Sequence, residues 1–273
     1  MRIQDVPPAA GTEVGLPGTD ASGPVLFARY AFPPNSHGFC GPADHAGFFE
    51  YGVAGVEAGL RDMVQQVAGA WPYLQLIAAA TGLADPLDRR VVEAYWVGTP
   101  RLDMVDTRSV GDSMEERFRY MTGARFGSLT GGVLAGGVPH HSFAVFCVYP
   151  YTGLLTDRRK APHALAVLDR CRIRWGRVLS ADGDQVVVES RPLTWDGQWL
   201  RLGPPQAETA VRSVDGIGLT GPMNPGDWVS LHWEWVCDRL TEALVARLGR
   251  YTERHLAIVN DRSTESTVPH ILG

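Results

Sequence analysis

The pattern of apolar residues changes at about residue 171, and this change limits the folds open to the chain. Before that point, apolar residues recur every three or four positions, as on one face of an amphipathic helix. After it come short apolar runs separated by turn signals such as Asp182-Gly183, Asp196-Gly197 and Pro225-Gly226. We therefore predict an α+β protein, with a mainly helical N-terminal region followed by a small antiparallel β-barrel of the OB-like kind and a C-terminal helix.

The predicted domain organisation follows from the same change. We expect residues 1–165 to form the helical region, 166–259 the barrel with its terminal helix, and 260–273 a flexible tail. The first 24 residues are rich in Pro, Gly, Ala and Thr, and we expect a loose arm there. With 273 residues and 45% hydrophobic residues, the chain has enough apolar material for a large core.

Within the first region, one stripe predicts a single long helix, with apolar residues at spacings of three and four. Its members are Phe49, Val53, Val56, Leu60, Met63 and Val67. Further helices are expected near residues 72–82, 87–98, 110–121 and 161–170. Two largely apolar runs, at 26–32 (LFARYAF) and 142–149 (SFAVFCVY), predict short strands.

Charge and targeting signals exclude several function classes. The net charge of −5 argues against a nucleic-acid-binding protein held by bulk charge. No apolar run reaches the roughly 18 residues of a membrane span, and the N-terminus lacks the apolar stretch of a secretory signal. We therefore expect a cytoplasmic protein whose four cysteines are reduced and do not form a zinc site of close cysteine pairs.

The segment 37–45 (HGFCGPADH) holds the most reactive side chains of the first region. Pro42 marks a helix start, so Cys40 lies at or just before the N-cap, where the helix field lowers a thiol pKa. Cys40 and His45 are thus candidates for a catalytic nucleophile and its base. They could equally bind a metal with His37 or with His141, or the segment could simply be a tight helix entry with a hydrogen-bonded histidine.

In the second region, three pieces occur in a recognisable order. Residues 171–178 (CRIRWGRV) start with a cysteine, followed by a glycine and an apolar β-branched residue; 182–188 (DGDQVVV) predicts a hairpin; and 225–232 (PGDWVSLH) predicts a strand that ends in histidine. In this order the pieces, followed by a terminal helix, resemble the HypC/HupF hydrogenase maturation chaperones over about residues 171–250. The family's cysteine stands at its N-terminus, whereas Cys171 is internal.

The resemblance implies a site as well as a fold. In that family the cysteine and the histidine are thought to hold an iron centre that carries cyanide and carbon monoxide, which the barrel passes to the large subunit of a nickel–iron hydrogenase. By position, Cys171 would supply the thiolate and His232 the imidazole. A thiolate with a neutral imidazole suits such iron. Without the resemblance, Cys171 would be read as a small core residue, since free cysteine is often buried.

These observations lead to alternative functions. The first is an accessory or maturation factor for a nickel–iron hydrogenase, which binds an iron intermediate, the large subunit or a maturation partner and is not itself an enzyme. The second is an enzyme that uses Cys40 with His45 or His141, as nucleophile and base or as a metal site. The third is an interaction module with an inert barrel.

Overall fold

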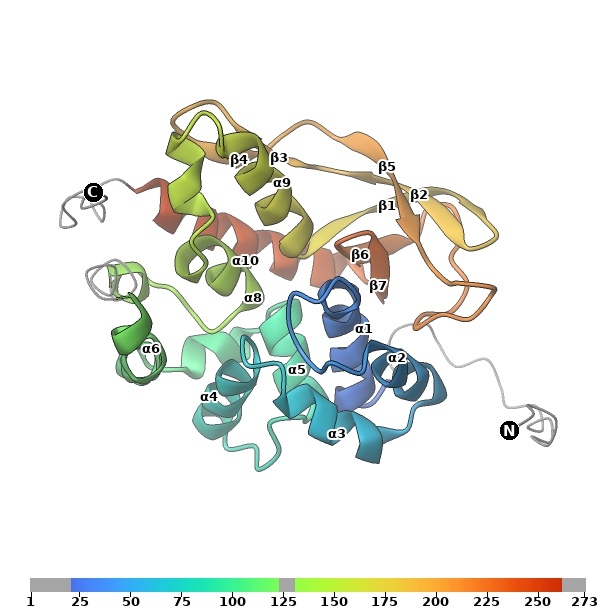
Figure 1. Cartoon of the computed structure of the whole chain (residues 1–273), viewed down its shortest axis with the longest axis horizontal. Coiled ribbons are helices and arrows are strands. Elements are labelled where there is room, and N and C mark those ends of the chain that lie inside the picture. Colours follow the sequence, from blue (N-terminus) through green and yellow to red (C-terminus); the bar gives the residue numbers. More distant parts are fainter. Residues whose placement is uncertain (1–20, 123–130, 262–273) are drawn as a thin grey trace.

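The structure, a computed structural model, describes residues 21–122 and 131–261 (Figure 1). The expected arm lies almost wholly outside these residues, as does nearly all of the expected tail at 260–273. The predicted helices near 72–82, 87–98, 110–121 and 161–170 are confirmed. The helices preceding the sheet are α1 (Gly23–Ser36), α2 (His45–Ala54), α3 (Glu57–Gln65), α4 (Trp71–Thr81), α5 (Arg89–Trp96), α6 (Thr107–Thr122), α8 (His141–Phe143) and α9 (Ala161–Cys171).

The run at 26–32 forms part of helix α1, so the predicted strand is wrong. Short continuous apolar runs fit a buried helix as well as a buried strand, because both are covered on all sides. Pro24 lies in the first turn of α1, where a missing N–H is tolerated. Leu26, Phe27 and Tyr30 are all fully buried, so α1 is a central helix rather than a surface element.

The predicted long helix is two helices, α2 and α3, which meet at Gly55. This glycine ends α2 in the left-handed conformation, with φ of 67°. Asp44 caps the start of α2 by accepting a hydrogen bond from the Gly47 amide, so Pro42 lies outside the helix. Of the predicted stripe, Val53 and Val56 are exposed. The regular spacing of the stripe therefore comes from two separate helices, each with its own buried face, and not from one long helix.

The run at 142–149 is buried as expected over its first half but is helical. It continues from α8 into a π-helical turn at Ala144–Val148. Val145 and Phe146 are fully buried there. As in α1, a segment that is buried on all sides has an apolar run, and such a run is the same for a strand and for a helix.

The second region is a curled sheet, at the upper right of Figure 1, followed by a long helix that runs across the middle of the view toward the C-terminus on the left. Its elements are β1 (Arg174–Asp182), β2 (Gln185–Ser190), β5 (Gln206–Val211), β6 (Trp228–His232), β7 (Trp235–Leu240) and α10 (Glu242–Asn260). A separate two-stranded sheet pairs β3 (Leu193–Trp195) with β4 (Leu200–Leu202).

In the curled sheet the strand order is β1-β2-β5-β7-β6, and β6 pairs again with β1. The β5–β7 contact is parallel and rests on one residue pair, Val211 with Trp235. The sheet is therefore mixed and only loosely joined at this seam, which corrects the prediction of an antiparallel β-barrel. The α+β class, the helical N-terminal region and the C-terminal helix are confirmed.

Helix α1 joins the two regions. It packs against α2, α3 and α5 on one side and against β6 and β7 on the other. The Tyr30 hydroxyl and the Ser230 hydroxyl lie 2.9 Å apart, and Arg29 forms a 2.9 Å ion pair with Asp238. One buried hydrophobic cluster contains residues of both regions, among them Phe27 and Trp235. The predicted boundary at 165/166 falls inside α9.

Candidate metal centre

Three potential metal ligands converge where the helical region meets the curled sheet. His141 begins α8, Cys171 ends α9 and His232 ends β6. Among the described residues these three form a group whose ligand atoms all lie within 4.8 Å of one another. Ligand atoms around a tetrahedral ion with bonds of 2.0–2.3 Å are separated by about 3.5 Å. The three ligand atoms would therefore have to move closer together to enclose an ion.

His232 presents a free lone pair to this group. Its Nδ1 lies 2.6 Å from the carbonyl oxygen of Tyr30, and because a carbonyl only accepts, Nδ1 carries the proton. The opposite nitrogen, Nε2, is buried and has no hydrogen-bond partner among the described residues. A backbone carbonyl that fixes the tautomer and leaves the second nitrogen bare is the usual arrangement of a metal-binding histidine. Burial lowers the pKa of His232 well below its usual range, so the ring is neutral.

His141 is oriented in a similar way but has two partners. Its Nε2 donates to the carbonyl oxygen of Cys171 over 2.8 Å, which leaves the lone pair on Nδ1. The Tyr95 hydroxyl lies 3.2 Å from that nitrogen and donates to it. Burial lowers the pKa of His141 to about 4, so it is neutral at pH 7. To bind a metal, His141 would have to give up one of these two contacts, with Tyr95 at Nδ1 or with the Cys171 carbonyl at Nε2.

Cys171 differs from the histidines because its ligand form is the deprotonated one. Burial raises the pKa of the thiol to about 12, and the nearby Cys40 sulfur adds to this shift. The thiol is therefore protonated at pH 7 while no ion is bound. A metal ion must displace this proton, as it does at other thiolate sites.

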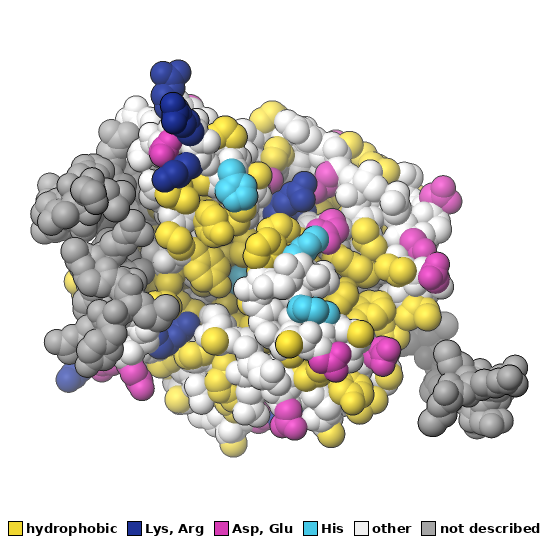
Figure 2. All heavy atoms as spheres, in the orientation of Figure 1, with side chains coloured by type: hydrophobic (Ala, Val, Ile, Leu, Met, Phe, Trp, Pro, Cys, Tyr) yellow, Lys and Arg dark blue, Asp and Glu magenta, His cyan; other side chains and the backbone are white. Residues whose placement is uncertain are grey.

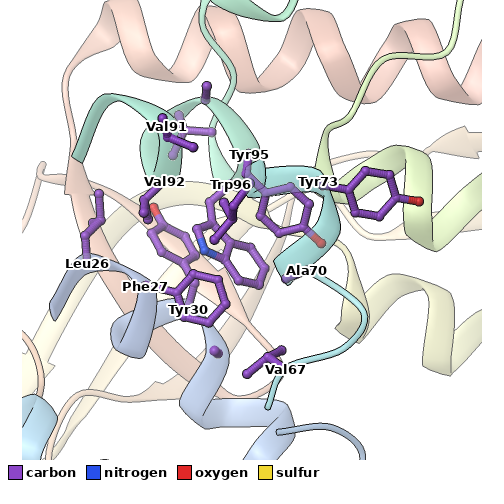
Figure 3. Packing of buried hydrophobic residues seen from close by; sticks show 14 of the residues in the cluster. Leu26, Phe27, Tyr30, Val67, Ala70, Tyr73, Val91, Val92, Tyr95 and Trp96 are labelled. Atoms are coloured by element: carbon purple, nitrogen blue, oxygen red, sulfur yellow. The ribbon is translucent and has the colours of Figure 1, made fainter. Parts of the chain in front are cut away.

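Aromatic rings enclose the two histidines. The Trp96 ring centroid lies 4.6 Å from that of His141 and 5.7 Å from that of His232, and the two histidine rings are 5.0 Å apart. Figure 3 shows Trp96 between Tyr95 and Tyr30 in the buried cluster. Such packing restricts ring rotation and keeps the surroundings apolar, which strengthens electrostatic interactions at the site.

The remaining candidates from segment 37–45 lie outside this group. His37 is partly exposed, and its Nε2 is 2.7 Å from a Glu234 carboxylate oxygen. Figure 2 shows histidine side chains among apolar and acidic ones on the face in view. His45 Nδ1 is 3.0 Å from the Asn35 side-chain oxygen, and the Asn35 amide donates to the carbonyl oxygen of Cys40. Asn35 thus contacts the ring of the predicted base and the backbone of the predicted nucleophile.

The expected lowering of the Cys40 pKa is wrong. The helix begins at His45 rather than at Pro42, so the thiol does not lie at a helix N-terminus. Burial is the dominant effect and raises the pKa of Cys40 to about 11. Cys40 is nevertheless close enough to Cys171 for their charges to interact. Catalysis by Cys40 with His45, and metal binding by Cys40 or His37, stay predictions.

Comparison with known proteins gives a family but no activity. The model of a family of unknown function, DUF6390, matches residues 19–266. The chain belongs to this family. The match spans both the helical region and the curled sheet, and includes all three candidate ligands. No curated protein and no solved structure matches the chain. Within the described part of this DUF6390 protein, no helix is long and apolar enough to span a membrane.

Sequence reasoning found the three converging residues but missed the groups that orient them. The backbone of Tyr30 orients His232, yet Tyr30 lies in the run that was predicted to be a strand. Tyr95, which contacts His141, carries no sequence signal that separates it from the other buried aromatic residues. Of the adjacent pair His140 and His141, only the second belongs to the group, and His140 Nδ1 lies 2.7 Å from the Ser142 hydroxyl instead.

Proposed function

We propose that this protein is a metal-binding accessory factor in which Cys171, His232 and His141 hold an iron ion. The observation that carries the proposal is the buried, unpartnered Nε2 of His232, which lies beside the other two ligands. An unsatisfied polar atom in an apolar interior is unfavourable, and a bound ion would supply its missing partner. Neutral imidazoles and a displaceable thiol proton complete a donor set ready for a cation.

The donor set indicates which ions fit. One thiolate and two imidazoles favour borderline or soft transition metals such as Fe²⁺, Co²⁺ and Zn²⁺ over Mg²⁺ or Ca²⁺. Three protein ligands leave at least one coordination position free, as in sites that exchange a ligand. Such a site suits an ion that is carried and released, rather than one that only stabilises the fold.

The cargo and its destination rest on the resemblance of residues 171–250 to HypC/HupF chaperones. In this proposal the iron is the cargo, and the acceptor is the large subunit of a nickel–iron hydrogenase or a maturation partner. Cys171 and His232 match the family's ligands by position. His141 comes from the helical region, which the resemblance does not cover, and would be an addition to the two-residue pattern.

Anaerobic titration with Co²⁺ tests the metal site. We expect wild-type protein to bind one ion with a thiolate-to-cobalt absorption band in the near ultraviolet. C171A should abolish the band, and H232A should raise the dissociation constant beyond the roughly 10–100-fold typical of changes to groups that only orient a ligand. C147A and H163A, which alter a thiol and an exposed histidine outside the group, are the matched controls. A wild-type spectrum without the band would refute the proposed centre.

Hydrogenase activity tests the destination. In a host that carries a matching nickel–iron hydrogenase, deletion of the gene should reduce activity, and C171A or H232A should fail to restore it. If only C40A fails to restore activity, the chemistry resides at Cys40 and the alternative function is supported. Normal activity in the deletion strain would contradict the hydrogenase proposal and leave the metal site to be judged by the cobalt titration.

A further inference from the structure

Arg174 is an almost fully buried cation close to the proposed centre. It is the first residue of β1, pairs with Leu231 across the sheet and has a side chain only 4% exposed. Buried arginines need ionic and hydrogen-bonded partners, because desolvation of an unpaired charge is strongly unfavourable. The partners of Arg174 therefore show what the side chain holds in place.

One set of partners lies at the end of α9. Nη1 donates to the carbonyl oxygens of Asp169 and Arg170, over 3.1 and 3.2 Å. Carbonyls in the last turn of a helix lack intrahelical partners, and basic side chains commonly satisfy them. Arg170 immediately precedes Cys171, so this contact fixes the backbone that carries the thiol.

The other partner lies in the turn between β6 and β7. Nη2 donates to the carbonyl oxygen of Trp233, the residue after His232. Trp233 has a φ of 52°, a left-handed conformation unusual for a residue with a side chain. In that conformation its N–H donates to the Arg170 carbonyl over 2.8 Å. The N–H of Trp233 is thus bonded to the end of α9, and its carbonyl oxygen is bonded to Arg174.

A carboxylate orients the guanidinium between these two sets. Nε and Nη2 of Arg174 reach the two oxygens of Glu208 on β5, over 3.2 and 3.1 Å. The Ser190 hydroxyl donates to the same carboxylate. The fork–fork pair fixes the plane of the guanidinium, a geometry that the single ammonium of lysine cannot reproduce.

We infer that Arg174 is a positioning residue that sets the separation between Cys171 and His232. It holds the chain at the residue before one ligand and at the residue after the other, through backbone carbonyls rather than through the ligand side chains. The inference rests on the proposed metal centre and extends it: the centre is built by a buried arginine that joins the helix to the hairpin.

The neighbouring Arg172 offers a matched control. Like Arg174, it is buried, and it pairs with Asp169. Its other partner is the carbonyl oxygen of Arg191, just before β3, and not the turn after β6. Arg172 therefore holds the α9 end without reaching the turn that carries His232. Replacing either arginine with lysine removes a buried fork of donors, but only R174K removes donors that reach the turn after His232.

The experiment compares R174K with R172K by Co²⁺ titration, after circular dichroism has shown that both are folded. We expect R174K to raise the dissociation constant by about 10–100-fold and to weaken the thiolate-to-cobalt band, and R172K to leave both unchanged. Equal effects of the two substitutions, or an unchanged constant in R174K, would overturn the positioning role.

Two further outcomes are distinguishable. If R174K does not fold, E208Q takes its place: it keeps the guanidinium but removes the charge that orients it, and it should weaken the band in the same direction. No effect of E208Q on binding would overturn the inference.

A wild-type protein without a thiolate band would refute the metal centre itself and the role of Arg174 with it. If wild type binds Co²⁺ and R174K binds it equally well, only the role of Arg174 is refuted.

Discussion

At the scale of single residues, the candidate centre combines two neutral histidines with a protonated thiol. The pKa of His141 is about 4 and that of His232 is lowered well below its usual range, so neither ring holds a proton to release above pH 6. Burial holds the pKa of Cys171 at about 12, so the thiol must lose its proton when an ion binds. The pH dependence of metal binding should therefore report on the cysteine alone.

This gives the first prediction. Release of one proton per ion makes the Co²⁺ association constant rise by about tenfold per pH unit between pH 6 and 8. Titrations at several pH values, or direct measurement of the protons released, will give the slope. A slope near two protons would show that a histidine also titrates in this range and would contradict the assignment of neutral rings.

A second residue-scale prediction concerns acid stability. His255 is buried; its Nδ1 lies 2.7 Å from the Ser142 hydroxyl, and burial lowers its pKa to about 3. Below about pH 6.5, His255 therefore binds a proton in the unfolded chain but stays neutral in the folded state. Stability is lost as the pH falls from there toward 3, by about 1.4 kcal/mol per pH unit for this group.

H255Q removes that proton-linked term. The free energy of unfolding should fall between pH 6.5 and pH 5 by about 2 kcal/mol less in H255Q than in wild type, whatever the substitution costs at pH 7. Urea unfolding at the two pH values gives the comparison, with H163Q on an exposed histidine as control. Equal acid sensitivity of H255Q and wild type would contradict a lowered pKa of His255 in the folded state.

At the scale of elements, the predictions that failed did so for two reasons. The run at 26–32 and the first half of the run at 142–149 are buried on all sides, and continuous burial erases the periodicity that separates helix from strand. The stripe at 49–67 failed for the opposite reason, because its spacing continues across a helix end that only the backbone of Gly55 reveals. Elements with one exposed face, such as α4, α6 and α9, were predictable.

Two glycines give an element-scale prediction. Gly55 has a φ of 67° and open space where an alanine methyl group would lie, so G55A carries only the left-handed backbone penalty of about 1–2 kcal/mol. Gly98, just after α5, has a φ of 96°, and an added Cβ would lie 2.1 Å from the Tyr251 ring of α10. We expect G98A to destabilise by about 2–5 kcal/mol, because overpacking adds to the backbone penalty. Thermal unfolding of both variants measures the difference, and equal shifts would contradict tight packing of Gly98 against Tyr251.

At the scale of the whole molecule, the candidate centre draws on segments that are distant in sequence. Cys171 and His232 could be paired from the sequence only through its resemblance to a family pattern, which stays a prediction. His141 was among several possible ligands, and its approach depends on how α8 packs beside the sheet, which no local pattern encodes. The orienting groups were out of reach for the same reason: the Tyr30 carbonyl and the Arg174 contacts exist only after α1 and the hairpin have come together.

The same interlocking predicts that the helical region and the curled sheet unfold together. Helix α1 packs on both, and Tyr30 alone contributes a hydroxyl contact with Ser230 and a carbonyl contact with His232 across the junction. Far-UV circular dichroism follows mainly the helices, whereas most of the tryptophans lie after residue 171. Urea unfolding curves recorded with the two probes should therefore have one common midpoint.

Y30F makes this test specific to the junction. Loss of the Tyr30 hydroxyl leaves the buried Ser230 hydroxyl without that partner, which should lower the free energy of unfolding by about 1 kcal/mol. If the protein unfolds as one cooperative unit, both probes should report the same decrease in the free energy of unfolding, because the junction unfolds together with both regions. If the sheet and the helical region were independent, their midpoints would separate in wild type, and Y30F would shift one curve more than the other. The candidate centre, whose three residues come from both sides of the junction, could then not keep its geometry through partial unfolding.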